Sequence, residues 1–133
     1  MNSLNGKIQQ LEISGNLTLV TIKVEECVFK SIVVETPETA KYLIEGGEIL
    51  VMFKETEVIL AKDLEIEISL RNKMPGTIKF IESGALLSKL ILDTNAGEII
   101  SIITTNAVNN LGLTTGSKIL AMVKTNEVLL AEC

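Results

Sequence analysis

The residue with the most distinctive chemistry is Arg71, the only arginine of the chain, in the stretch SLRNKMPGTI from Ser69 to Ile78. A guanidinium is a planar fork of donors that can hold two oxygen atoms of one anion, which a lysine ammonium cannot do. Ser69 lies on the same side of an extended segment as Arg71 and adds a hydroxyl. Two interpretations stand at this point: Arg71 binds an oxyanion, or it forms a surface ion pair with a nearby glutamate.

The groups that most often carry out catalysis are scarce. The chain has no histidine, so the commonest general base and metal ligand are both missing. Its two cysteines, Cys27 and Cys133, lack metal-ligand spacing and indicate a small half-buried residue and a free terminal thiol. Acidic pairs such as Glu25-Glu26 are typical of a solvated turn or strand face. We therefore expect no enzyme, no catalytic residue, no cofactor and no metal-cation site.

The composition of the chain argues against two classes of partner, nucleic acids and membranes. The net charge is -5 and no long basic run occurs, which argues against nucleic acid as a partner. No segment approaches the roughly 18 apolar residues that span a bilayer. The N-terminus MNSLNGKIQQ has no basic head before an apolar block, so we expect a cytoplasmic protein without a membrane partner.

An internal repeat organises the chain. Residues 46–61, GGEILVMFKETEVILA, align without gaps on residues 116–131, GSKILAMVKTNEVLLA, with 9 of 16 positions identical. The same offset of 70 residues places Asn2 on Asn72 and Gly6 on Gly76. We interpret this as a tandem duplication with one domain over residues 1–63 and a second over residues 64–133.

Strand periodicity dominates inside each repeat. Residues 17–24 and 86–93 alternate apolar with polar, with a change of phase near Leu19-Val20 that predicts a β-bulge. The other predicted strands are β-branched runs at 31–35 and 99–104, and the pairs at 49–54 with 57–61 and 119–124 with 127–131. Residues 36–47 and 105–116 have helical character, with Thr36 and either Thr104 or Thr105 as N-caps. The sequence predicts a mainly β protein of two tandem OB-like five-stranded barrels, each with one short helix.

The order of these features resembles the Mop-type molbindin domain (Mop/TOBE), which also occurs in tandem. The family pattern Ser-Ala-Arg-Asn-x-Leu-x-Gly is matched here by Ser69, Leu70, Arg71, Asn72, Lys73, Met74, Pro75 and Gly76. The resemblance covers almost the whole chain and implies that the ligand is molybdate, with tungstate as a close analogue. Molybdate is a tetrahedral dianion that only accepts hydrogen bonds, so its pocket needs arginine, lysine, hydroxyl and backbone N–H donors.

The resemblance implies a set of binding residues in each repeat. In repeat two they are Ser69, Arg71, Asn72, Thr104, Lys124 and Thr125; in repeat one they are Thr36, Thr39 and Lys54. The alternatives are that the threonines only cap helices and that the lysines are only solvated. Repeat one lacks the Ser-x-Arg residues and has Glu55 where repeat two has Thr125, so we expect the halves to bind unequally.

The functional expectation is storage or buffering of molybdate. The alternative is a regulatory or protein-interaction module of the molybdate-sensing type with weakened anion binding. Because single-domain members assemble as hexamers, the resemblance implies a homotrimer of two-domain chains. Runs such as GEIISIITTNAV, apolar on both faces, support such an assembly.

Overall fold

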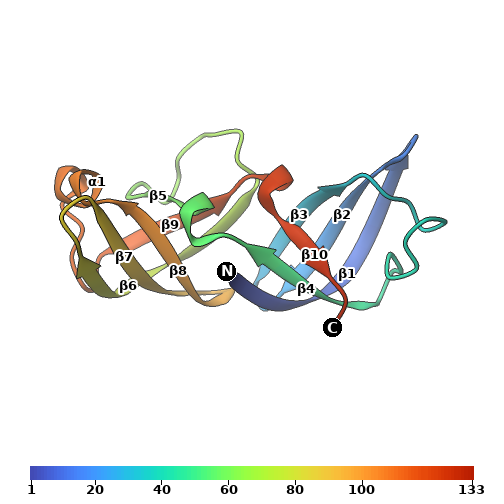
Figure 1. The fold of residues 1–133 in the computed structure, drawn as a ribbon, viewed down its shortest axis with the longest axis horizontal. Coiled ribbons are helices and arrows are strands. Elements are labelled where there is room, and N and C mark those ends of the chain that lie inside the picture. The colour runs from blue at the N-terminus through green and yellow to red at the C-terminus, as the bar shows by residue number, and fades with distance from the viewer.

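The computed structural model describes all residues, 1–133, as a mainly β fold with two five-stranded antiparallel sheets and one α-helix (Figure 1). The first repeat contains β1 (Asn2–Ser14), β2 (Leu17–Val24), β3 (Cys27–Val33), β4 (Glu48–Phe53), the 3₁₀ turn η1 (Glu55–Glu57) and β5 (Ile59–Ala61). The second contains β6 (Asn72–Ser83), β7 (Leu87–Thr94), β8 (Gly97–Thr104), α1 (Thr105–Leu111), β9 (Lys118–Val123), η2 (Thr125–Glu127) and β10 (Leu129–Ala131). The predicted class, a tandem mainly β protein, is confirmed.

The closing strand of each repeat belongs to the sheet of the other repeat. The strand orders are β10-β4-β1-β2-β3 and β5-β9-β6-β7-β8. Figure 1 shows β10, in red, crossing onto the first sheet beside β4. The prediction that five strands of one repeat close their own barrel is therefore wrong for the last strand. The two closing strands read Ile-Leu-Ala and Leu-Leu-Ala, so each offers the other sheet nearly the same apolar pattern.

The predicted helix of repeat one is absent, which corrects the expectation of one helix in each repeat. Residues 36–47 form turns, and the Thr39 hydroxyl accepts a hydrogen bond from the Thr36 N–H at 2.9 Å. Such side-chain bonds compete with the helical backbone pattern. In α1, by contrast, Thr104 Oγ1 accepts from the Ala107 N–H at 3.1 Å and Gly112 ends the helix in the left-handed conformation. Thr104 is thus the N-cap of the single helix.

The irregularity predicted in β2 also lies elsewhere. The register shifts occur in β1 at Gln9 and in β6 at Lys79, so the bulges belong to the first strand of each repeat. Inside β2 the register with β3 is unbroken, and Thr18 is fully buried, with its hydroxyl donating to the Glu35 carbonyl at 2.5 Å. A polar residue on the inner face produced the apparent change of phase near Leu19-Val20.

The core runs through both repeats. A single cluster of 24 buried apolar residues includes Ile8 and Phe29 from repeat one together with Ile78 and Leu90 from repeat two. Cys133 is exposed, as predicted, whereas Cys27 is buried in the cluster more completely than the predicted half-buried position. Because one core serves both repeats, the two sheets support each other. No helix has the length and apolar character that a membrane crossing needs.

Candidate functional site

The junction between the sheets is fixed by two asparagine side chains. Asn72, at the start of β6, accepts from the Lys30 N–H at 2.6 Å and donates to the Lys30 carbonyl at 2.9 Å. Asn2, at the start of β1, makes the equivalent pair of bonds to Ile100, both at 2.8 Å. Lys30 and Ile100 lie on β3 and β8, the edge strands of their sheets. These amides satisfy edge groups that would otherwise be open to another strand.

Arg71 and Lys124 come together at this junction. The ladder between β6 and β9 ends with the pair Asn72–Val123, and the next residue outward on each strand is Arg71 and Lys124. Thr125 follows as the first residue of η2, which packs against β3 of the other sheet. Arg71, Lys124 and Thr125 therefore lie at one end of this strand pair, and a guanidinium, an ammonium and a hydroxyl are all groups that can donate to an anion.

The Arg71 side chain is exposed and makes no ion pair. Its Nη2 donates to the Ile68 carbonyl and its Nε lies 3.4 Å from the Ser69 carbonyl, so it is held over its own connecting segment. The two ion pairs of the structure are Met1 with Glu55 and Lys79 with Glu98. The alternative interpretation, in which Arg71 pairs with a glutamate, is therefore wrong. These two bonds leave further guanidinium N–H groups available.

Repeat one has a different group at the matching place. The ladder between β1 and β4 ends with Asn2–Phe53, followed by Met1 and Lys54. The Met1 ammonium donates to the Glu55 carboxylate, and this hydrogen bond lowers the pKa of Glu55. A carboxylate thus lies where repeat two has the Thr125 hydroxyl.

The predicted threonines lie on other segments. Thr104 is four residues beyond Ile100, the β8 residue that Asn2 of repeat one binds, a span of about 13 Å in a strand. Thr36 follows β3 and bonds with Thr39 in an exposed turn. Arg71, Lys124 and Thr125 therefore lie at one end of a strand pair, whereas Thr36, Thr39 and Thr104 lie on segments outside it.

Asn72 has a contact that the sequence did not predict. It is completely buried, and both polar atoms of its side chain bind the backbone of Lys30. The sequence feature that could have indicated this contact was the alignment of Asn2 on Asn72, which places a polar residue at the same strand position in both repeats.

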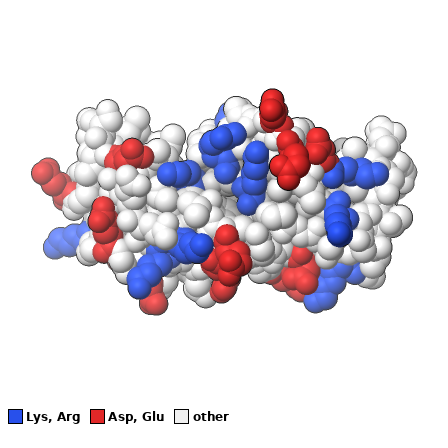
Figure 2. All heavy atoms as spheres, turned by 180° about the vertical axis from the view of Figure 1, so that it is seen from behind, with Lys and Arg blue, Asp and Glu red and all other residues white.

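On the face shown in Figure 2, lysine and arginine side chains gather near the middle of the molecule with acidic side chains among them.

Comparison with known proteins agrees with this geometry. Residues 68–130 match the TOBE domain. Molybdenum-pterin-binding protein 2 of Clostridium pasteurianum is 30% identical over 66 residues, which cover 49% of this chain and 97% of that protein. Molybdenum-pterin-binding protein 1 of the same organism is 29% identical over the same shares of both chains. The solved structure of the cytoplasmic molybdate-binding protein ModG, with molybdate bound, superposes with a TM-score of 0.89 at 28% identity, covering 99% of this chain and 96% of that one.

The two curled sheets and the match of residues 68–130 define a tandem-repeat protein with a TOBE domain in its second repeat. Its relatives are described as binding proteins. The chain belongs to the molybdenum-pterin-binding (Mop) protein family.

Proposed function

We propose that this chain binds molybdate, and tungstate with it, as a cytoplasmic store or buffer and without catalysis. The observation that carries the proposal is the position of Arg71 opposite Lys124, with Thr125 beside them, at the end of the β6–β9 pair. The guanidinium can hold two oxygens of a tetrahedral dianion, and the ammonium and the hydroxyl can hold the others. The similarity to ModG over the whole chain supports this ligand.

In this proposal Asn72 acts indirectly. Both polar atoms of its side-chain amide bind the backbone of Lys30. Asn72 therefore fixes the start of β6 and, with it, the position of the neighbouring Arg71. Ser69 lies in the connecting segment next to Arg71 and supplies a further hydroxyl. Discrimination between molybdate and tungstate is not expected, because they are nearly equal in size and charge, whereas the smaller sulfate fits less well.

Repeat one binds more weakly than repeat two. Lys54 is present there, but the Glu55 carboxylate faces the same region and repels an anion. This inequality comes from the residues at the two strand ends, Glu55 in repeat one and Thr125 in repeat two.

The site is completed by another copy of the chain. Thr36 and Thr39 lie in a turn after β3 and Thr104 lies at the end of β8, so none of them belongs to the strand ends that hold Arg71 and Lys124. The outer faces also expose large apolar side chains, among them Val34 and Leu86, at 70% and 81% exposure. A closed homotrimer covers such faces and brings threonines of one chain near the arginine of the next.

Calorimetric titration with molybdate, tungstate and sulfate tests the ligand, and light scattering tests the assembly. We expect saturable heat with molybdate and tungstate, weaker heat with sulfate, and the mass of a trimer. Absence of saturable heat at ligand concentrations up to about a millimolar, equivalent to a binding free energy weaker than about -4 kcal/mol, would reject storage of the anion. A monomer mass at micromolar concentration would reject sites shared between chains.

A further inference from the structure

A surface pocket of about 500 Å³ opens on the first sheet. Its lining comes from β1, β2, β4 and the end of the chain: Asn5, Gly6, Lys7, Lys23, Glu48 and Cys133. None of these residues belongs to the proposed molybdate site. Volumes of about 300–1,000 Å³ are typical of sites for small organic molecules.

Two lysines of the pocket face each other across neighbouring strands. Lys7 of β1 is the register partner of Lys23 of β2, which places their Cβ atoms about 4.5–5.5 Å apart. Like charges directly opposite each other destabilise a sheet. Neither lysine is in an ion pair, since the two pairs of the structure involve other residues. A dianion between the two ammonium groups would remove this repulsion.

The remaining polar side chains make one side of the pocket a hydrogen-bond donor and the other side negatively charged. Asn5 lies two residues before Lys7 and so on the same face of β1, where its amide adds donors. Glu48 is the partner of Lys7 on the opposite side, in β4. A bare dianion would be attracted by the lysines and repelled by Glu48. A ligand that also carries a hydroxyl or amino group can donate to the Glu48 carboxylate instead.

Repeat two serves as an internal comparison. At the offset of 70 residues, Asn5 corresponds to Pro75, Lys7 to Thr77 and Lys23 to Asp93. Both ammonium groups are lost there, one of them to a carboxylate. None of the four pockets of the structure is lined by these residues. The pocket, which Cys133 of repeat two also lines, therefore occurs on the first sheet alone and does not follow from the shared fold.

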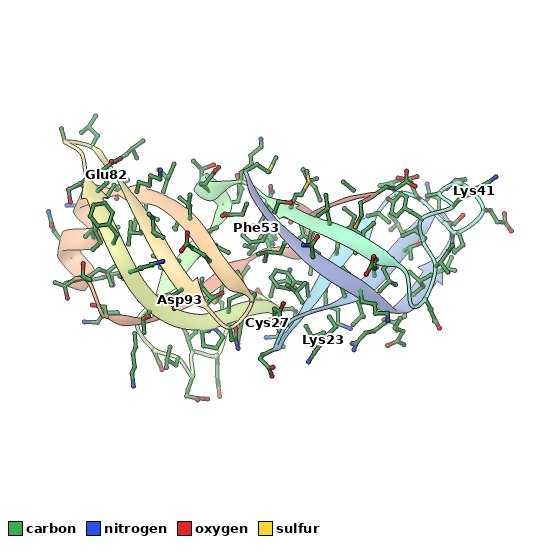
Figure 3. All side chains as sticks on the ribbon, turned by 90° about the horizontal axis from the view of Figure 1, so that it is seen from below. Lys23, Cys27, Lys41, Phe53, Glu82 and Asp93 are labelled. Atoms are coloured by element: carbon green, nitrogen blue, oxygen red, sulfur yellow. The ribbon has the colours of Figure 1, made fainter.

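We propose that this pocket binds a small organic phosphate monoester. The phosphate dianion lies between Lys7 and Lys23 with the Asn5 amide beside it, and a hydroxyl or amino group of the organic part donates to Glu48. Figure 3 shows Lys23 near the middle of the molecule, close to Cys27, and Lys41 at the far end of the same half. Lys41 is thus a lysine of equal charge outside the pocket.

The test is a titration of the ¹⁵N-labelled full chain with ribose 5-phosphate, followed by the amide signals of Asn5, Gly6, Lys7 and Lys23. We expect saturable shifts confined to the pocket. The variant with both Lys7→Thr and Lys23→Asp, which installs the residues of repeat two, should bind at least tenfold more weakly, while Lys41→Ala should bind as the parent does. Retained dispersion of the spectrum shows that each variant is folded.

Two results would overturn the proposal. One is the absence of saturable pocket shifts up to about 10 mM ribose 5-phosphate, a binding free energy weaker than about -3 kcal/mol. The other is equal binding of inorganic phosphate, because the organic group would then contribute nothing through Glu48. Molybdate titrations of the same variants keep the two sites separate: the double variant should retain the molybdate affinity of the parent, whether that affinity is strong or absent.

Discussion

The side chain of Asn72 satisfies both backbone groups of Lys30, across the junction between the two sheets. Asn72 is at 0% exposure, so no water can replace it. A side-chain amide thus acts as one residue of an additional strand along the edge of β3. Asn2 does the same for Ile100 on β8.

Replacing Asn72 by alanine should destabilise the fold strongly. The change removes two hydrogen bonds and leaves the Lys30 N–H and carbonyl unpaired, which together should lower the free energy of unfolding by about 2–4 kcal/mol. Urea denaturation measures the loss. Asn109→Ala, at an exposed position of α1, is the matched control and should change stability by less than about 0.5 kcal/mol. Equal stability of the two variants would contradict the clamping role of Asn72.

Replacing Arg71 by alanine should weaken molybdate binding and leave the fold intact. The variant loses two charge-assisted hydrogen bonds to the anion, each contributing about 1.5–3 kcal/mol, so calorimetry should show a loss of roughly a hundredfold or more. Arg71→Lys keeps the charge without the fork and should fall between. The exposed side chain contributes little to stability. Unchanged affinity in a folded Arg71→Ala variant would place the anion elsewhere.

The two repeats should respond differently to loss of their lysines. Lys124→Ala should reduce molybdate affinity more than Lys54→Ala, because Lys124 is followed by Thr125 and Lys54 by a carboxylate. Glu55→Thr, which gives repeat one the residue of repeat two, should raise the number of molybdate ions bound per chain. Calorimetric stoichiometry measures this. Equal losses from the two lysine variants would show that the sites are equivalent.

Glu25 should be a position at which a substitution stabilises the protein. It is the one non-glycine residue with positive φ, at 50°, in the turn between β2 and β3. The left-handed conformation costs most residues about 1–2 kcal/mol, and asparagine tolerates it better. Glu25→Asn should therefore increase the free energy of unfolding by about 0.5–1 kcal/mol. Glu26→Asn is the control for the loss of charge and should show no such increase.

The two cysteines should differ sharply in reactivity. Cys27 is at 4% exposure with its Sγ 2.6 Å from Asn95 Oδ1, and burial raises the pKa of its thiol. A thiol reagent at pH 8 should modify the exposed Cys133 quickly and Cys27 only on unfolding. Because the folded pKa of Cys27 is raised, its contribution to stability is complete below the unfolded pKa, about 8.5, and is lost as the pH rises toward the folded value. Rapid modification of both thiols in the native protein would contradict the burial of Cys27.

The duplication and the strands could be predicted because they depend on local signals: identical residues at a constant offset and alternating apolar positions. The exchange of β5 and β10 could not, because the two segments are nearly the same in sequence and either sheet would accept either strand. The helix in repeat one was predicted wrongly because Thr36-Pro37 also suits a turn, and the Thr39 hydroxyl decides the competition.

Only those parts of the candidate site that depend on residue type and on neighbouring strands could be predicted. Arg71 and Lys124 stood out by residue type and by resemblance, and antiparallel pairing then places them opposite each other. The hydrogen bonds of Asn72 depend on contact with a strand of the other repeat, 42 residues away in sequence, which periodicity does not reveal. The pocket at Lys7 and Lys23 forms because the two lysines are register partners on neighbouring strands. The sequence shows a lysine in each strand but not which residues of the two strands pair.

The exchange of closing strands also changes what the segment between the repeats is needed for. If a protease cut the exposed segment between β5 and β6, each fragment would still contribute a strand to the sheet of the other. The fragments would remain together by complementation, in the manner of a split protein whose halves are inactive alone. The covalent link therefore guarantees equal numbers of the two halves, and the β-ladders hold them together.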